Sequence, residues 1–186
     1  ATLKNASGQP YGPVPGAVAL DDLRAFADDS ASVIVLDAET GARHPVWAEI
    51  DLNAGQIIPS VANEASPLAK RPALIVRPAS NFVEGRRDVA VLRQLQNEQG
   101  AVLPAQSPFA LCRDGSDTPT AQLPPLAARC AALESQVFPV LAQAGIERDE
   151  NLYLAWDFTI ASAENQLARL RHLRDDAFAD LGEQGQ

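Results

Sequence analysis

Short apolar segments separated by turn residues fill the middle of the sequence, between residues 71 and 114. Pro78 ends the first segment, because proline cannot donate a hydrogen bond within a sheet. Turn residues follow at 81–85 and again at 97–100. The short strands predicted here are residues 73–76, 89–93, 102–103 and 109–112. Repeated short strands between turns are typical of a β-sandwich.

The N-terminal third predicts two further strands behind a lead-in with little regular structure. Residues 1–31 form this lead-in, with a short helix at about residues 20–28, where Leu and Phe recur three residues apart. Residues 32–37 are an apolar strand, and residues 43–52 alternate apolar and polar side chains. Pro45 indicates that this second strand lies at a sheet edge or begins late.

The C-terminal third begins with a predicted long helix. Pro124 and Pro125 open it, since proline suits a first turn, and Gly145 ends it. Pro139 interrupts the helix and should kink or split it near Phe138. The apolar stripe at helical spacing consists of Leu126, Cys130, Leu133, Val137 and Leu141.

A strand and a second helix complete the prediction. Residues 152–158 alternate so that Leu152, Leu154, Trp156 and Phe158 share one face. Ser162 is the predicted N-cap of a helix that ends at Gly182 and carries a stripe of Leu167, Leu170, Ala177 and Leu181. The predicted fold class is therefore mainly β with helical additions (α+β), with two longer helices and one strand in the C-terminal third. Residues 32–186 form a single domain behind the lead-in.

Length and charge limit what such a chain can bind. The 186 residues are 46% hydrophobic, which is the composition of a folded domain. The formal net charge of −9 repels phosphate backbones, so we expect no nucleic-acid partner. No apolar run approaches the roughly 20 residues that span a bilayer, so we expect no membrane span. The sequence lacks Met altogether, and we expect a processed form or a piece of a longer chain.

Two cysteines, Cys112 and Cys130, allow two interpretations. Both can be buried thiols that behave as small apolar side chains. Alternatively they form a disulfide that closes the polar, proline-bearing segment between residues 114 and 125. We favour the disulfide, which would place the chain in an oxidising, extracytoplasmic compartment.

No set of residues in the sequence predicts catalysis. The G-x-S-x-G turn that exposes the nucleophile of α/β-hydrolases is absent. His44 lies near Asp37, Glu49 and Asp51, which suggests a dyad or a metal site, but the short ligand spacings of metal sites do not recur. An exposed strand histidine, and a solvated helix position for His172, are the ordinary interpretations. We assign no catalytic, cofactor or metal residue, and we expect this chain not to hydrolyse short acyl esters.

Two further groups of residues suggest binding. Asp114, Ser116 and Asp117 resemble the start of a calcium loop, but the later bidentate acid is missing, so a plain polar loop is expected. Trp47 and Tyr153 could stack on sugars if they are exposed. Aromatic residues make up only 5% of the chain, which argues against a sugar platform built from several rings.

Two stretches resemble regions of exported bacterial proteins. The first runs from an apolar strand through Arg77-Pro78-Ala79, Asn81-Phe82, Gly85, a second strand, Gly100 and Phe109, and it resembles bacterial Ig-like domains of cell-surface and exported proteins. The second comprises residues 154–159, then Ala161-Ser162 and an Arg-rich helix with Arg174-Asp175-Asp176. It resembles large exported proteins in which an Ig-like region precedes an α/β-hydrolase domain of the lipase or esterase kind.

The resemblance covers most of residues 32–182 and implies an Ig-like β-sandwich. One departure is Asp88, where related sequences tend to have an aromatic residue at the start of the strand. The implied function is that of a non-catalytic, extracytoplasmic accessory domain that positions a following hydrolase domain or meets a surface partner. The alternatives are a stand-alone surface or polysaccharide-binding module, and a fragment that contributes residues to a lipase or esterase.

Overall fold

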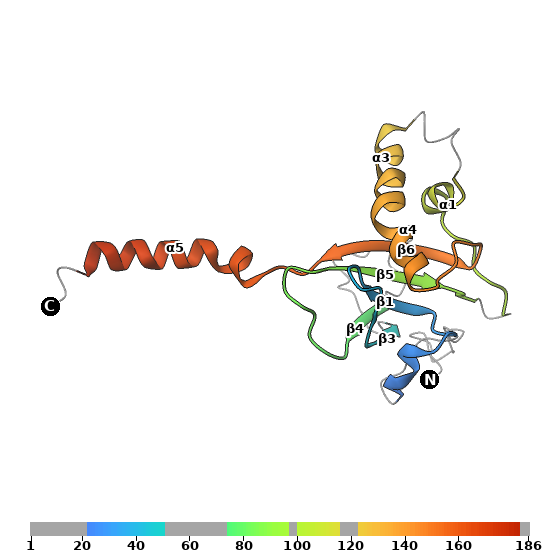
Figure 1. Ribbon diagram of the computed structural model, residues 1–186, viewed down its shortest axis with the longest axis horizontal. Helices are drawn as coiled ribbons and strands as arrows, with labels where there is room; N and C mark the ends of the chain where they lie inside the picture. The colour runs from blue at the N-terminus through green and yellow to red at the C-terminus, as the bar shows by residue number, and fades with distance from the viewer. Residues whose placement is uncertain (1–21, 51–73, 97–99, 116–122, 183–186) are drawn as a thin grey trace, which may run out of the picture.

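A computed structural model of the chain describes residues 22–50, 74–96, 100–115 and 123–182 (Figure 1). Its centre is a four-stranded antiparallel sheet with strand order β2-β1-β5-β6. The strands are β1 (Val33–Asp37), β2 (Arg43–His44), β5 (Arg87–Arg93) and β6 (Leu152–Thr159). The apolar runs that the sequence offers at 32–37, 89–93 and 152–158 thus form the three longer strands, as predicted.

A second, two-stranded sheet covers one face of the first. It pairs β3 (Val46–Ile50) with β4 (Leu74–Pro78) in antiparallel register. Val46 packs against Val35 and Ala90 in a small buried cluster between the two sheets. Half-buried side chains complete this cluster: Val76, Phe82, Trp156 and Phe158.

Helical segments cover the other face. They are α1 (Ser107–Arg113), α3 (Pro124–Ala132), the π-helical segment η4 (Leu133–Val137) and α4 (Phe138–Gln143). Ile34 and Leu36 of β1 and Val89 and Val91 of β5 alternate toward these helices and form the larger core with them. The α+β class is confirmed, whereas the described residues show no closed sandwich.

Pro45 divides the strand that the sequence predicts over residues 43–52. Residues before it belong to β2 in the large sheet, and residues after it belong to β3 in the small one. Because proline lacks an N–H, the chain leaves one ladder there and joins another. At the N-terminal side, the short helix expected at 20–28 is a 3-10 turn, η1 (Leu23–Ala27); the rest of the lead-in lies outside the described residues.

The strand predicted at residues 109–112 is wrong, because these residues lie in helix α1. Pro108 occupies the first turn of this helix, where a missing N–H does no harm. Phe109 and Cys112, three residues apart, both turn toward the larger core. The strand predicted at 102–103 is reduced to a single bridge between Gln96 and Val102.

Pro139 interrupts the long helix, as predicted, and a π-helical segment accommodates it. The five residues of η4 precede Pro139, which lies in the first turn of α4. Inside this wider turn the Ser135 hydroxyl donates to the Ala131 carbonyl at 2.9 Å, and Arg87 of β5 donates to the Gln136 carbonyl at 2.9 Å. These donors satisfy carbonyl groups near the interruption. Gly145 has a φ of +70° and ends the helix, as predicted.

The prediction that Leu152, Leu154, Trp156 and Phe158 share one face of β6 is partly wrong. Arg93 pairs with Leu152 and Leu92 with Leu154, so Tyr153 is an extra residue in a β-bulge. The bulge reverses the alternation. Leu152 therefore joins the core beneath the helices, while Trp156 and Phe158 face the second sheet.

The last helix, α5 (Ala163–Leu181), extends away from the rest of the described chain (Figure 1). Ser162 caps it, as predicted, by accepting a hydrogen bond from the Asn165 N–H at 3.1 Å. None of its residues is buried. Within the described ranges, no helix has both the length and the apolar character needed to cross a membrane.

Candidate functional site

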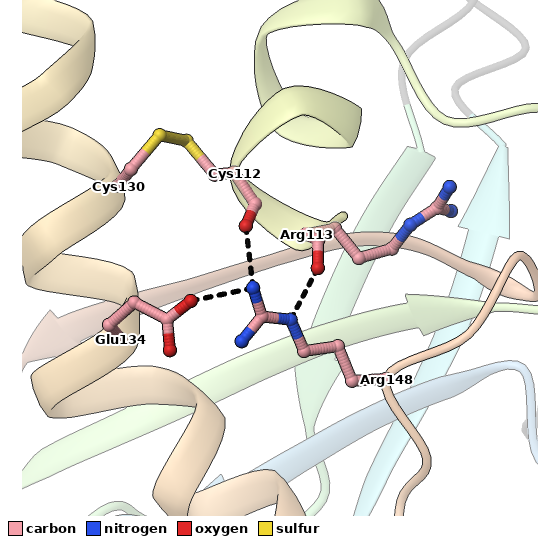
Figure 2. The surroundings of a disulfide bond; sticks show 5 residues. All are labelled: Cys112, Arg113, Cys130, Glu134 and Arg148. Atoms are coloured by element: carbon pink, nitrogen blue, oxygen red, sulfur yellow. Dashed lines mark hydrogen bonds and ion pairs between the residues drawn. A yellow bond between two sulfur atoms is a disulfide. The ribbon is translucent and has the colours of Figure 1, made fainter. Parts of the chain in front are cut away.

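Cys112 at the end of α1 and Cys130 in α3 form a disulfide (Figure 2), which is the pairing that the sequence favours. Their Cα atoms are 4.8 Å apart. Cys112 is buried in the larger core, and Cys130 packs against it from the other helix. The bond therefore fastens the two helices to each other above the sheet.

Arg148 completes the fastening from the loop that follows α4. Its guanidinium donates to the carbonyl oxygens of Cys112, at 2.7 Å, and of Arg113 (Figure 2). It also forms an ion pair with Glu134 of η4 at 2.6 Å, and it lies 4.0 Å from the centre of the Phe138 ring. One side chain thus joins the C-terminal end of α1 to the π-helical segment. These contacts indicate a structural role.

A second polar cluster lies where β1 and β5 meet at one end of the large sheet. Burial alone would raise the pKa of Asp37, but hydrogen bonds from Arg86, Thr40 and Glu39 outweigh it and lower the pKa to about 2. Arg86 donates to Asp37 at 2.8 Å and lies 3.6 Å from Glu39. This acid is therefore fully charged and well partnered at neutral pH.

Asp88, which pairs with Asp37 across the strands, has the opposite environment. Asp88 is 4% exposed, and its Oδ2 atom has no hydrogen-bond partner among the described residues. Burial is the main reason that the pKa of Asp88 is raised, and nearby His44 acts against it. Asp88 is two residues from Ala90 on the same face of β5, so it points into the space between the two sheets.

His44 lies beside this acid but is not arranged as a general base. Its ring stacks on Phe82 with 4.2 Å between centroids. Its Nε2 atom is 3.0 Å from the Ser80 carbonyl oxygen, and a carbonyl only accepts, so this contact assigns the proton to Nε2. The Ser80 hydroxyl, 3.5 Å from the same nitrogen, therefore has no base to receive its proton.

A cavity of about 230 Å³ lies between the two sheets, and every residue that lines it has an apolar side chain. Val35 and Ala90 contribute from the large sheet, and Val46 and Val76 contribute from the small one. The half-buried rings of Phe82, Trp156 and Phe158 border it. Phe158 pairs with Asp88 across β5 and β6, but Asp88 is not among the residues that line this cavity.

The other residues singled out in the sequence are not brought together. Asp114 is paired with Arg113 at 2.7 Å, and this hydrogen bond lowers its pKa; Ser116 and Asp117 lie outside the described residues. Trp47 is on β3, with the Arg77 guanidinium 5.4 Å from its ring centre, whereas Tyr153 is on the other sheet. His172 forms a helical pair with Asp176 on exposed α5.

Neither a metal centre nor a set of catalytic residues forms among the described residues. No three His, Cys, Asp or Glu side chains in these ranges are grouped so as to hold a metal ion. Of the acids suggested as partners for His44, Asp37 is committed to Arg86 and Glu49 to Arg77, while Asp51 lies outside the described residues. Asp88 is the acid beside His44 instead. The only sequence signal for it is the departure from an aromatic residue at that strand position.

Comparisons with protein-family models, with curated protein sequences and with solved structures found no match for this chain.

Proposed function

We propose that this chain is a non-catalytic, extracytoplasmic domain that holds a neighbouring domain of the same exported protein in position. The observation that carries this proposal is helix α5, which extends from the body of the fold with its apolar side chains exposed. Leu170, Phe178 and Leu181 are 62%, 67% and 66% exposed.

Two physical arguments indicate that another surface covers α5. An isolated helix of this length is only marginally stable in water. Burying a Leu or Phe side chain contributes about 1.5–3 kcal/mol, so covering three of them would stabilise the helix substantially. The helix is also stabilised near its start by the N-cap Ser162 and by the ion pair between Arg171 and Glu164, at 3.0 Å. These contacts do not bury Leu170, Phe178 or Leu181.

The disulfide supports the extracytoplasmic location. Cytosolic thiols are kept reduced, so a structural disulfide between two helices is expected in an oxidising compartment. The segment that it closes contains Pro124 and Pro125 in the first turn of α3. The bond joins α1 to α3.

The nature of the neighbouring domain is proposed from the resemblance in sequence. We expect an Ig-like core here and an α/β-hydrolase of the lipase or esterase kind as the neighbour. A coding sequence that places a strand and then a G-x-S-x-G motif after Gln186 would support this assignment. Fold analogy alone does not establish an activity, so the experiment below tests the positioning role itself.

Leu170→Asp in the full-length protein tests this role, with Ala168→Asp as the matched control on the polar side of α5. Hydrogen exchange of the α5 amides is the measurement. We expect the amides to be protected in the full-length protein, to lose protection with Leu170→Asp and to keep it with Ala168→Asp, since a charge buried without a partner costs a few kcal/mol.

The 186-residue chain supplies the reference, and there the α5 amides should exchange rapidly with or without either substitution. Equal exchange of α5 in the full-length protein and in the 186-residue chain would contradict the positioning role. Protection in the 186-residue chain that grows with its concentration would also contradict it, by identifying a second copy as the partner.

A further inference from the structure

Strand β4 of the small sheet pairs with β3 along one edge, and its other edge faces outward. The Ala79 N–H donates to the Pro45 carbonyl at 2.8 Å, directly beyond the ladder between these strands. Hydrogen-bonded pairs alternate with non-bonded pairs along an antiparallel ladder, so Arg77 is bonded to β3. Val76, the next residue, therefore points its N–H and C=O groups away from β3.

The outward edge of β4 is open to a further strand. Leu74 lies two residues before Val76 and has the same orientation, and both residues are half-buried. Among the described residues, no hydrogen bond outside the ladder with β3 involves the backbone of Leu74 or Val76. Pro78 also lies on this edge and lacks an N–H, so the edge available for pairing ends there. A row of unpaired donors and acceptors is a template for an added strand.

The large sheet presents apolar side chains beyond this edge. β3 contacts β1, whereas Val76 of β4 shares a cluster with Ala90 of β5 and Trp156 of β6. The small sheet therefore lies across the large one with β4 toward β6. Trp156 and Phe158 of β6 are only half-buried, and both border the apolar cavity of about 230 Å³. A strand added beside β4 lies over these rings.

The cavity indicates which side chains the added strand carries. Every second side chain of a strand faces the same side, so alternate residues of the added strand face the large sheet. The cavity is lined by apolar side chains alone, so these residues must be apolar too. An apolar cavity of about 150 Å³ admits benzene, so this one has room for a large aliphatic side chain.

The loop between β4 and β5 indicates where the added strand comes from. Glu84 in this loop accepts a hydrogen bond from the Ala163 N–H at 2.8 Å, where α5 begins. Gly85 donates to the Ile160 carbonyl at 2.9 Å. The loop thus connects β4 to the base of α5 (Figure 1), so a domain that covers α5 lies close to β4. A second copy of this chain fits less well, because each copy has a formal net charge of −9.

We propose that an extended segment of the neighbouring domain adds to the small sheet beside β4. Its backbone pairs with Leu74 and Val76, and its alternate apolar side chains enter the cavity between the sheets. Hydrogen bonds to the backbone align such a segment, whereas the side chains in the cavity select its sequence. This inference rests on the proposed function, because the domain that covers α5 is the source of the strand.

Site-resolved hydrogen exchange of the β4 amides tests the added strand, because β4 contains its own control. The Arg77 amide is bonded to β3 and should be protected both in the full-length protein and in the 186-residue chain. The Val76 amide should exchange rapidly in the 186-residue chain. In the full-length protein it should exchange at least about a hundredfold more slowly, because the added strand supplies its hydrogen-bond acceptor.

The α5 amides, measured in the same experiment, separate this inference from the proposed function. Protected α5 amides together with a Val76 amide that is equally fast in both proteins would overturn the added strand and leave the positioning role intact. Exposed α5 amides with a protected Val76 amide would support the strand and contradict the role of α5. Slow exchange of the Val76 amide in the 186-residue chain would overturn the inference, since this chain or a second copy would then be the occupant.

Two substitutions in the full-length protein test the cavity. Ala90→Leu fills part of it from the large sheet, so the Val76 amide should exchange at least about tenfold faster. Ala142→Leu makes the same change at an exposed position of α4 and should leave this exchange unchanged. A protected Arg77 amide establishes that the small sheet is intact in each variant.

An unchanged Val76 amide in a folded Ala90→Leu protein would overturn the insertion of side chains into the cavity. If Ala90→Leu does not fold, the comparison of the unsubstituted full-length protein with the 186-residue chain decides whether the strand is added.

Discussion

Asp37 and Asp88 face each other across β1 and β5, yet their surroundings shift their pKa values in opposite directions. Asp37 ends its strand and accepts hydrogen bonds from Arg86, Thr40 and the Glu39 backbone, so its charged form is favoured. Asp88 begins its strand beneath the second sheet, where burial favours the neutral form. Two identical side chains at one register position thus have different chemistry, because Asp37 accepts several hydrogen bonds whereas Asp88 is buried.

Asp88→Asn should stabilise the protein at neutral pH, by about 1 kcal/mol or more, because it replaces a buried carboxylate with an uncharged amide of the same shape. Because the pKa of Asp88 is raised in the folded state, its neutral form contributes to the stability of the fold. This contribution is fully present below the unfolded pKa of 3.8 and is lost as pH rises through the folded pKa. The increase in the free energy of unfolding caused by Asp88→Asn should therefore become larger between pH 4 and pH 7. Urea unfolding across this range measures it.

Asp37→Asn is the matched comparison and should show the opposite trend. Because the pKa of Asp37 is lowered, its charged form stabilises the folded protein above pH 3.8. This stabilisation is lost as pH falls through the folded pKa of about 2. The decrease in the free energy of unfolding caused by Asp37→Asn should therefore be largest at neutral pH and become smaller toward pH 2. A gain from Asp88→Asn that does not vary between pH 4 and pH 7 would show that Asp88 is not held neutral by burial.

Among the helices and strands, the sequence correctly predicted the features that depend on residues close together in the chain. The apolar runs of β1 and β5, the N-cap at Ser162 and the interruption at Pro139 are each determined by neighbours in the chain. The error at residues 109–112 has a physical cause, because four apolar residues fit a short strand and one turn of a helix equally well. Pro108 was the local signal for the helix.

Features that depend on distant partners could not be predicted in the same way. The bulge at Tyr153 follows from how β6 pairs with β5, and no residue within β6 indicates it. The contacts of Arg148 depend on three elements that meet above the sheet. The burial of Asp88 depends on the second sheet. The candidate site is therefore less predictable than the elements that form it.

The disulfide between Cys112 and Cys130 joins helices α1 and α3 covalently. Cys112→Ser with Cys130→Ser should lower the free energy of unfolding by about 3 kcal/mol, because the bond closes a chain segment of 18 residues in the unfolded state. Urea unfolding of this double variant, of the oxidised protein and of the reduced protein gives the comparison. The reduced protein should match the double variant, and equal stability of all three would contradict the proposed stabilisation.

The described part of the molecule has three layers and one extension. A two-stranded sheet, a four-stranded sheet and a helical layer enclose two cores, and α5 leaves this body with its apolar residues exposed (Figure 1). The apolar cavity lies between the sheets, whereas the disulfide lies between the helices. The cavity and the exposed apolar residues of α5 therefore lie in separate parts of the molecule.

The proposed location of the protein in an oxidising compartment depends on the disulfide between Cys112 and Cys130. Counting free thiols in the denatured, unreduced protein, isolated with alkylation at the moment of lysis, tests it most directly. We predict no free thiol before reduction and two after it, since the chain has two cysteines and both are paired. Two free thiols before reduction would contradict both the disulfide and the extracytoplasmic location that rests on it.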